Sequence, residues 1–225
     1  MNALHVLRRP LAGFVRFIKK LAGYYALPLY ILKRPFDGFY TMKYQKKGMA
    51  GVAAFNFLAL SASFSFMNQY SSIVVNKSYP MGKNSLADFT ALFVALVLFC
   101  VSNWSITCLT DGEGRLGDVF MAVCYAMTPM ILTFIPATLI SNILAEGEGA
   151  FFFMLVGVSV CWFILLTFFG LVTIHNYMAG KALLTMFLTV VALLIIVFLI
   201  VLLVTLYQQL VNFVMSIYTE LAYRY

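Results

Sequence analysis

Charged residues are scarce in this chain of 225 residues, where Asp, Glu, Lys and Arg together make up 10%. Soluble domains carry about 25%. Hydrophobic residues make up 63% of the chain, and 22 residues are Phe. This balance excludes a soluble globular protein.

Residues typical of catalytic and metal-binding sites are also scarce. The two histidines, His5 and His175, are separated by four predicted spans, which argues against a histidine metal site. We find no Ser-His-Asp set, no HExxH motif and no pair of acids deep in an apolar run. We therefore predict that the protein is not an enzyme and holds no cofactor or metal. The cysteines lie in apolar runs without CxxC spacing, so we predict that they serve as packing residues and form no disulfide framework. They are Cys100, Cys108, Cys124 and Cys161.

The chain instead has five long runs without charge, of which the shortest has 22 residues and the longest 38. About 20 residues cross a bilayer as a helix. We therefore predict an all-α membrane protein, a bundle of five transmembrane helices preceded by amphipathic interfacial helices. The last run is nearly twice as long as a bilayer requires, and Gln208, Gln209 and Asn212 mark its exit. The predicted domains are a basic amphipathic segment (1–47), a five-helix domain (48–210) and an external C-terminal helix (211–225).

Positive charge is concentrated before the first run. Because basic flanks remain in the cytoplasm, the N-terminus is predicted to be cytoplasmic and the C-terminus external. A net charge of +7 gathered on one face favours anionic lipid headgroups over nucleic acid as a partner. The alternative is a solvated basic tail. The predicted lipid-binding residues are Arg8, Arg9, Arg16, Lys19, Lys20, Lys33, Arg34, Lys43, Lys46 and Lys47.

Prolines predict where helices start and break. Pro28 indicates a bend between two N-terminal helices, and Pro35 indicates the start of the second one. Pro129 and Pro136 predict that the third span is kinked or broken. Thr128 and Thr133 are expected to bond to the carbonyls that these prolines release.

In the first span, the polar residues Asn56, Ser61, Ser63 and Ser65 are expected to face neighbouring helices.

The turn between the second and third spans contains the pattern G-x-G-x-x-G, at Gly112, Gly114 and Gly117. A nucleotide site would need a strand before these glycines, and a membrane helix stands there instead. We expect the glycines to supply positive φ. Asp118 is expected at the start of the third span, where the helix dipole favours a carboxylate. With Asp111 and Glu113, it can hold a cation or pair with the basic N-terminal segment; no metal-ligand spacing is met.

The residues around this turn carry a family resemblance. Asn103-Trp104 is followed by Leu109-Thr110-Asp111-Gly112-Glu113-Gly114 and by Tyr125-Ala126-Met127-Thr128-Pro129, and Pro35-Phe36-Asp37-Gly38-Phe39 precedes the first span. With five spans, this resembles the YIP1 family in its short bacterial form, over residues 33–181 and most specifically over 103–129. The resemblance implies a cytoplasmic N-terminus in a bacterial cell membrane. Eukaryotic relatives are Golgi and endoplasmic-reticulum proteins, linked to small GTPases through longer N-terminal regions than this basic segment.

We therefore expect a non-enzymatic scaffold that binds other integral membrane proteins or forms a homo-oligomer. The alternative is a transport protein or an accessory subunit of a larger transporter, such as an ABC-type importer. The residues that carry the resemblance are the candidates for a partner site. A competing interpretation is that they only fix the geometry of a helical hairpin. These candidates are Asn103, Trp104, Asp111, Gly112, Tyr125 and Pro129.

Overall fold

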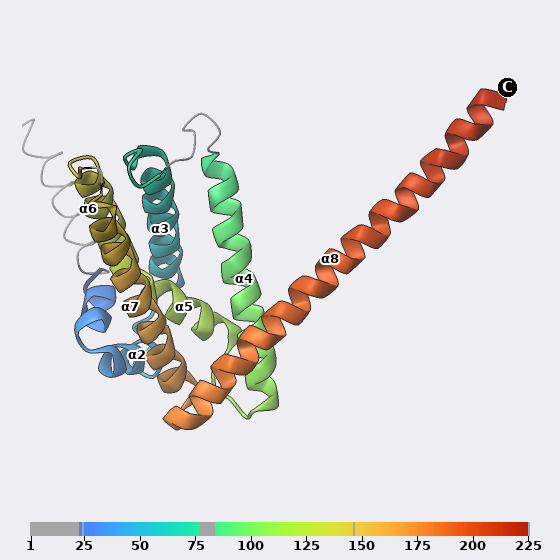
Figure 1. Cartoon of the computed structure of the whole chain (residues 1–225). Helices are drawn as coiled ribbons and strands as arrows, with labels where there is room; N and C mark the ends of the chain where they lie inside the picture. The colour runs from blue at the N-terminus through green and yellow to red at the C-terminus, as the bar shows by residue number, and fades with distance from the viewer. Residues whose placement is uncertain (1–22, 24, 77–83, 146, 225) are drawn as a thin grey trace, which may run out of the picture.

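The computed structural model describes residues 23, 25–76, 84–145 and 147–224, which form helices and turns without a strand (Figure 1). A helical stretch over residues 25–33 precedes α2. Five helical segments are long and apolar enough to cross a membrane, with α5 and α6 counted as one. The predicted fold class is confirmed. The labelled helices are α2 (Pro35–Lys43), α3 (Ala50–Tyr70), α4 (Ser85–Leu109), α5 (Leu116–Ala126), α6 (Thr128–Ser141), α7 (Gly149–His175) and α8 (Ala179–Arg224).

The N-terminal bend lies at Arg34. The prediction of a bend at Pro28 is wrong, because the helical stretch 25–33 continues through that residue. Arg34 has φ −136° and ψ 82°. The proline ring of Pro35 clashes with a helical residue before it and so favours this extended conformation. Pro35 then starts α2, as predicted, and α2 packs against α7 with Phe39 fully buried.

The third span is broken into two helices, as its prolines predict. α5 ends at Ala126 and α6 begins at Thr128. Because Pro129 lacks an N–H group, the carbonyl of Tyr125 loses its usual helical donor. The hydroxyl of Thr128 donates to that carbonyl at 2.7 Å. This part of the prediction is confirmed.

Thr133 acts differently from the prediction. Pro136 removes the donor for the carbonyl of Leu132, four residues earlier. The hydroxyl of Thr133 instead donates to the carbonyl of Pro129 at 2.7 Å. A threonine in a helix reaches the carbonyl three or four residues before it, so Thr133 has no access to the carbonyl of Leu132, the residue immediately before it.

Three of the four polar residues that we expected to face neighbouring helices from α3 are buried, and the fourth, Ser65, is half-buried. Asn56 is fully buried, and its Nδ2 donates to the carbonyl of Cys124 at 3.3 Å and to Thr128 Oγ1 at 3.4 Å. Ser61 and Ser63 are buried as well. These contacts join α3 to the break between α5 and α6, so the broken span lies at the centre of the bundle. The four cysteines are free thiols.

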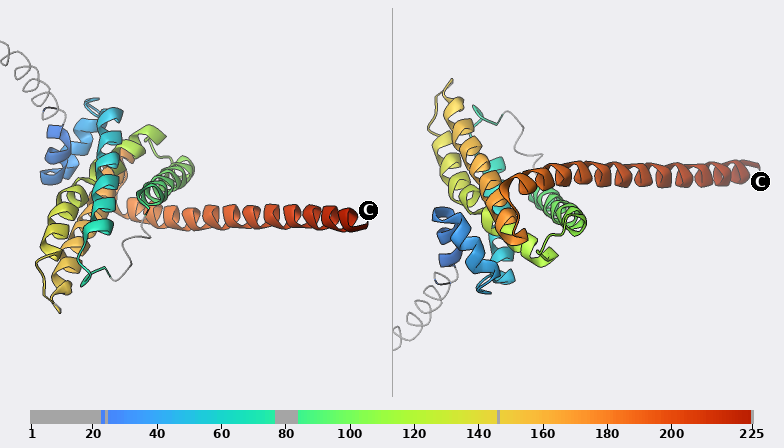
Figure 2. Two further views of the ribbon diagram at one scale, coloured as in Figure 1. Left: turned by 90° about the horizontal axis from the view of Figure 1, so that it is seen from above. Right: turned by 90° about the horizontal axis from the view of Figure 1, so that it is seen from below.

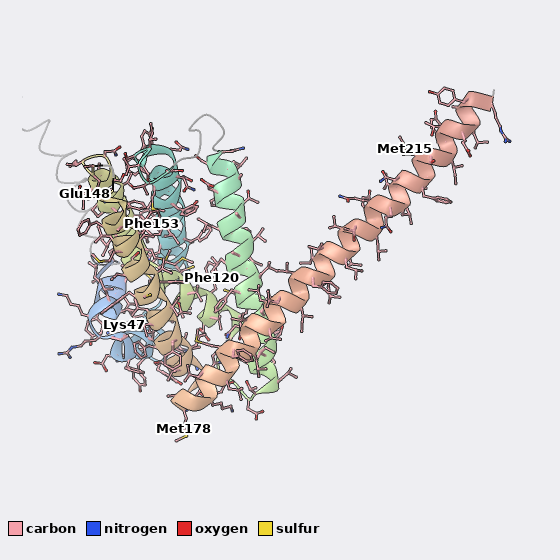
Figure 3. The ribbon with its side chains drawn as sticks, viewed as in Figure 1. Lys47, Phe120, Glu148, Phe153, Met178 and Met215 are labelled. Atoms are coloured by element: carbon pink, nitrogen blue, oxygen red, sulfur yellow. The ribbon has the colours of Figure 1, made fainter. Side chains whose placement is uncertain are left out.

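α8 differs from the other helices because it leaves the bundle (Figures 1 and 2). It is one continuous helix of 46 residues, with no break at the predicted border between residues 210 and 211. At 1.5 Å per residue it is about 69 Å long, against about 30 Å for a hydrocarbon core. Ala182, Thr185 and Thr189 are buried against the bundle. Every residue from Phe198 to Arg224 is exposed, and side chains such as Met215 project far from the other helices (Figure 3).

Candidate functional site

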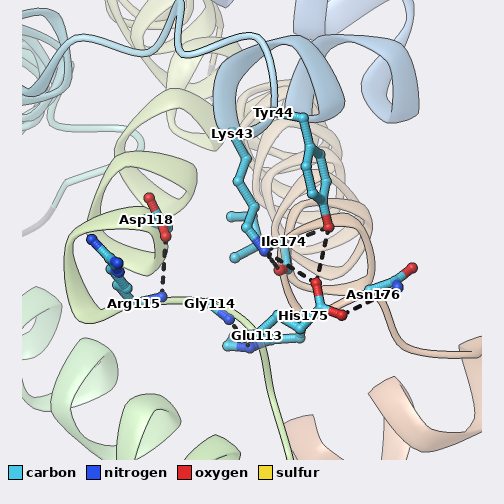
Figure 4. Close-up of polar contacts among 9 residues, drawn as sticks. All are labelled: Lys43, Tyr44, Glu113, Gly114, Arg115, Asp118, Ile174, His175 and Asn176. Atoms are coloured by element: carbon cyan, nitrogen blue, oxygen red, sulfur yellow. Dashed lines mark hydrogen bonds and ion pairs between the residues drawn. The ribbon is translucent and has the colours of Figure 1, made fainter.

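Three segments that are distant in the sequence meet at one end of the bundle (Figure 4). They are the end of α2, the turn between α4 and α5, and the turn between α7 and α8. We name this region the three-segment junction. It consists of Lys43, Tyr44, Thr110, Gly112, Glu113, Gly114, His175, Asn176 and Tyr177.

The carboxylate of Glu113 connects all three segments. Its Oε2 lies 3.8 Å from Lys43 Nζ and accepts a hydrogen bond from the Tyr44 hydroxyl at 3.3 Å. Its Oε1 accepts from Asn176 Nδ2 at 3.5 Å. The expected pairing of an acid in this turn with the basic N-terminal segment is therefore confirmed for Glu113.

Lys43 is the cation that pairs with Glu113. Its side chain is 13% exposed, against 55% for Glu113. Its Nζ also donates to the carbonyl of Ile174, in the last turn of α7. Helix C-termini carry partial negative charge, so a partly buried ammonium at this position stabilises α7 in addition to pairing with Glu113. The pairing of an exposed carboxylate contributes less, about 0–1 kcal/mol.

The phenol of Tyr44 is held in its protonated form. Burial raises its pKa above the ordinary value of 10.0, and the negative charge of Glu113 raises it further. The hydroxyl is therefore a hydrogen-bond donor to Glu113 throughout the physiological pH range.

His175 fills the space beside the two glycines of the turn. It is 2% exposed, its Nδ1 accepts a hydrogen bond from the Gly114 N–H at 3.2 Å, and its ring stacks on Tyr177 at 5.3 Å between centroids. A Cβ at Gly112 would lie 2.6 Å from both His175 Nδ1 and the Tyr177 hydroxyl oxygen. A Cβ at Gly114 would lie 2.5 Å from a methyl carbon of Ile174. Both glycines are needed for the close approach of α7.

The expectation of positive φ at the turn glycines is wrong. The left-handed residues are Asp111, with φ 56°, and Asn176, with φ 55°, in the two turns that meet here. Asp and Asn tolerate this conformation better than most residues. A glycine in a turn indicates either positive φ or close packing. In this turn glycine is required because the backbone packs against His175.

Tyr177 joins the second turn to α4. Its hydroxyl donates to the Thr110 carbonyl at 3.1 Å and lies 2.8 Å from Thr110 Oγ1. Lys181 Nζ lies 4.6 Å from the centroid of the Tyr177 ring, a cation–π distance. The start of α8 is therefore fixed to the end of α4.

The candidate partner-site residues do not form one surface. Gly112 belongs to the three-segment junction, and Asp111, which precedes it in the same turn, is exposed. Asn103 is fully buried, and its Nδ2 donates to Thr189 Oγ1 on α8 at 3.1 Å. Trp104, the next residue on α4, is 43% exposed.

The other two candidates lie in the interior of the third span. Tyr125 is buried, and its hydroxyl accepts from the Met49 N–H at 3.1 Å and donates to the Met49 carbonyl at 3.2 Å. These bonds hold the N-terminus of α3 against α5. Pro129 is buried in the first turn of α6. The structure thus divides the six residues among three contacts: α4 with α8, the junction, and α3 with the broken span.

The predicted lipid-binding residues fall into three groups. Lys43 turns into the protein, so we remove it from this set. The lysines and arginines that are exposed are Lys33, Arg34, Lys46 and Lys47. The remaining predicted residues lie outside the described part of the chain: Arg8, Arg9, Arg16, Lys19 and Lys20.

Asp118 lies in the first turn of α5, as predicted, and its Oδ2 accepts from the Arg115 N–H at 3.1 Å. Among the residues that the structure describes, no three His, Cys, Asp or Glu side chains are grouped as a metal site would require.

Sequence reasoning missed the contributions of Lys43, Tyr44 and Tyr177. The available signal was a run of polar residues, His175-Asn176-Tyr177, at the end of an apolar run.

These features define an integral membrane protein with five helical spans whose turns are joined at one end. The profile of the Yip1 domain matches residues 29–217, from the stretch before α2 to the distal part of α8. The chain therefore belongs to the Yip1 family, and the resemblance described above is confirmed. No curated protein and no solved structure matches it.

Proposed function

We propose that this Yip1-family protein is a non-enzymatic membrane scaffold that binds other integral membrane proteins along α8. The observation that carries the proposal is the exposed distal part of this helix, from Phe198 to Arg224. Its charge-free run alone is about 57 Å long, so a helix perpendicular to the bilayer extends beyond the hydrocarbon core. The apolar side chains in the part of α8 beyond the hydrocarbon core are stabilised by contact with the surface of another protein.

The distal part of α8 has a seven-residue apolar pattern. Apolar side chains recur at alternating spacings of three and four, at Ile200, Leu203, Tyr207, Leu210, Val214, Ile217 and Leu221. Polar side chains gather on the opposite side of the helix, at Thr205, Gln208, Gln209, Asn212, Ser216 and Thr219. This is the pattern of a coiled-coil seam, in which two helices wind around each other. We name the seven apolar residues the α8 seam.

A second copy of the chain fits this seam. Copies inserted in the same direction have parallel α8 helices, so identical seams face each other without a change of register. The first seam position of the repeat holds Ile200, Tyr207, Val214 and Leu221, and the second holds Leu203, Leu210 and Ile217, so β-branched residues stand at two of four first positions and Leu at two of three second positions, a partial match to parallel two-stranded coiled coils. We therefore propose that self-association is the first step in scaffold assembly.

The basic N-terminal residues provide the second part of the proposed function. Exposed Lys33, Arg34, Lys46 and Lys47 surround α2, next to the start of α3. Each basic residue near an anionic surface contributes about 1 kcal/mol of binding. We propose that this end of the bundle faces the cytoplasmic leaflet of a bacterial cell membrane, in accord with the preference of basic flanks for that side.

Cysteine cross-linking in native membranes tests the scaffold proposal. In a background where exposed Cys108 and Cys161 are replaced by Ser, we expect Val214→Cys to form disulfide-linked dimers and Asn212→Cys, on the polar side, to remain monomeric. Equal cross-linking at both positions, or none at either, would contradict the seam. Substrate-specific flux through vesicles that contain the isolated chain would instead support the transporter alternative.

A further inference from the structure

An apolar cavity lies inside the spanning part of the bundle. Its volume is about 500 Å³, within the range of about 300–1,000 Å³ typical of small-molecule sites. Side chains from α3, α4, α5, α6, α7 and α8 line it, together with Met127 at the break between α5 and α6. Representative lining residues are Leu92, Ala95, Phe99, Met127, Thr167 and Met186.

Thr167 is the one hydroxyl-bearing side chain among the described lining residues, and the others are apolar. It is 4% exposed, and its Oγ1 has no hydrogen-bond partner among the described residues. Other threonines in these helices bond to the carbonyl four residues earlier, as Thr173 does to Phe169 and Thr185 does to Lys181, both at 2.8 Å. A buried hydroxyl without a partner is unfavourable, so this one is available to a ligand.

The cavity is open to the side, because lining residues on three helices are exposed: Ala95 on α4, Ile164 on α7 and Val190 on α8. α8 contacts α4 near its start and then diverges from the bundle (Figures 1 and 2). In a membrane protein, the surroundings of this opening are the hydrocarbon chains of lipids.

The depth of Thr167 agrees with a lipid ligand. It lies eight residues before His175, the end of α7, which corresponds to about 12 Å along the helix. α7 is about 40 Å long and the hydrocarbon core about 30 Å, so a centred α7 puts Thr167 about 7 Å inside the core boundary. An ester carbonyl, which joins a lipid headgroup to its chains, reaches this depth when the chain is drawn into the cavity.

We propose that the cavity binds one acyl chain of a membrane glycerolipid and that Thr167 Oγ1 donates a hydrogen bond to the ester carbonyl of that chain. The apolar lining excludes water, and the single donor fixes how far the chain enters. This site is independent of the α8 seam and of the proposed scaffold function.

Photolabelling tests the site. The full-length protein is reconstituted in vesicles of a phosphatidylcholine that bears a diazirine on one acyl chain, irradiated, digested and mapped by mass spectrometry. We expect label on Met127, which lines the cavity but is only 7% exposed, and which lipid outside the bundle does not reach. Absence of label on Met127 in the folded wild-type protein would overturn the proposal.

Two substitutions separate chain binding from general lipid contact. Ala95→Phe fills the cavity from its open side and should abolish the label on Met127. Val97→Phe introduces the same side chain at an exposed α4 residue that does not line the cavity and should leave the label unchanged. Thr167→Val removes one hydrogen bond and should reduce the label about threefold to tenfold at limiting lipid. Equal labelling of Met127 in wild type and Ala95→Phe, with both folded by thermal unfolding, would refute the site.

Discussion

The amide of Asn103 on α4 and the hydroxyl of Thr189 on α8 form a buried hydrogen bond of 3.1 Å. The Thr189 hydroxyl in turn donates to the Thr185 carbonyl at 2.8 Å, so the bond continues into the backbone of α8. Because α8 packs against the bundle over its first part alone, this bond lies where the helix is held.

We expect Asn103→Leu to weaken the attachment of α8. Hydrogen bonds between membrane helices contribute about 0.6 kcal/mol on average and up to about 1.7 kcal/mol, so the free energy of unfolding should fall within this range. Unfolding in mixed detergent micelles measures it. Trp104→Phe, at an exposed neighbouring position, is the control and should have no effect. Equal losses in the two variants would contradict a specific role of Asn103.

A second prediction compares Gly112, in the turn between α4 and α5, with Gly117, in the first turn of α5. Gly112→Ala introduces a Cβ 2.6 Å from His175 and Tyr177 and should destabilise the protein by about 1–3 kcal/mol, the usual cost of overpacking. At Gly117 a Cβ meets no atom within 4 Å, and alanine favours the helix by up to about 1 kcal/mol. Thermal unfolding should therefore separate the two variants. Similar melting temperatures would show that the turn adapts to the added methyl group.

A third prediction concerns the two partners of the ion pair. Glu113→Gln should cost less than about 1 kcal/mol, because the carboxylate is exposed and Gln retains one of its two acceptor oxygens, for either Tyr44 or Asn176. Lys43→Met removes a partly buried cation that also bonds to the end of α7 and should cost more, about 1–2 kcal/mol. The unfolding free energies of the two single variants and the double variant measure this difference. Equal losses would mean that the lysine does not stabilise α7 beyond its pairing with Glu113.

The partner-site hypothesis is tested at Asp111. Asn accepts the left-handed conformation of this residue, so Asp111→Asn should leave the melting temperature nearly unchanged while it removes an exposed charge. If the turn binds a partner, proteins that co-purify with the wild type in mild detergent should be recovered at lower yield. Full recovery with unchanged stability would support the competing interpretation, in which the turn fixes only the helical hairpin.

Topology provides a further prediction. A reporter fused before Met1 should be cytoplasmic and a reporter fused after Tyr225 should be external, because five spans separate the two ends. Both ends on the same side would indicate that one apolar segment does not cross, and the 38-residue run that forms most of α8 is the first candidate.

Local patterns in the sequence were sufficient to predict the five spans and the break at Pro129, because apolar run length and a missing N–H act within one helix. The inward position of Lys43 was not predictable in this way. Its partners, Glu113 and Ile174, are 70 and 131 residues away in the chain, and a count of basic residues treats it like the exposed Lys46 and Lys47. The need for glycine at position 112 was not predictable from local sequence either, because it comes from the packing of a histidine on another helix.

Thr189 is the last buried residue of α8, so the direction of the long exposed part is set by the contacts at and before this residue. Leu221 lies 32 residues beyond this point, which is about 48 Å along a rigid helix. A change of about 10° in the direction of α8 at Thr189 would therefore displace Leu221 by about 8 Å. A small adjustment in the contact between α4 and α8 thus changes the area over which the distal end searches for another chain.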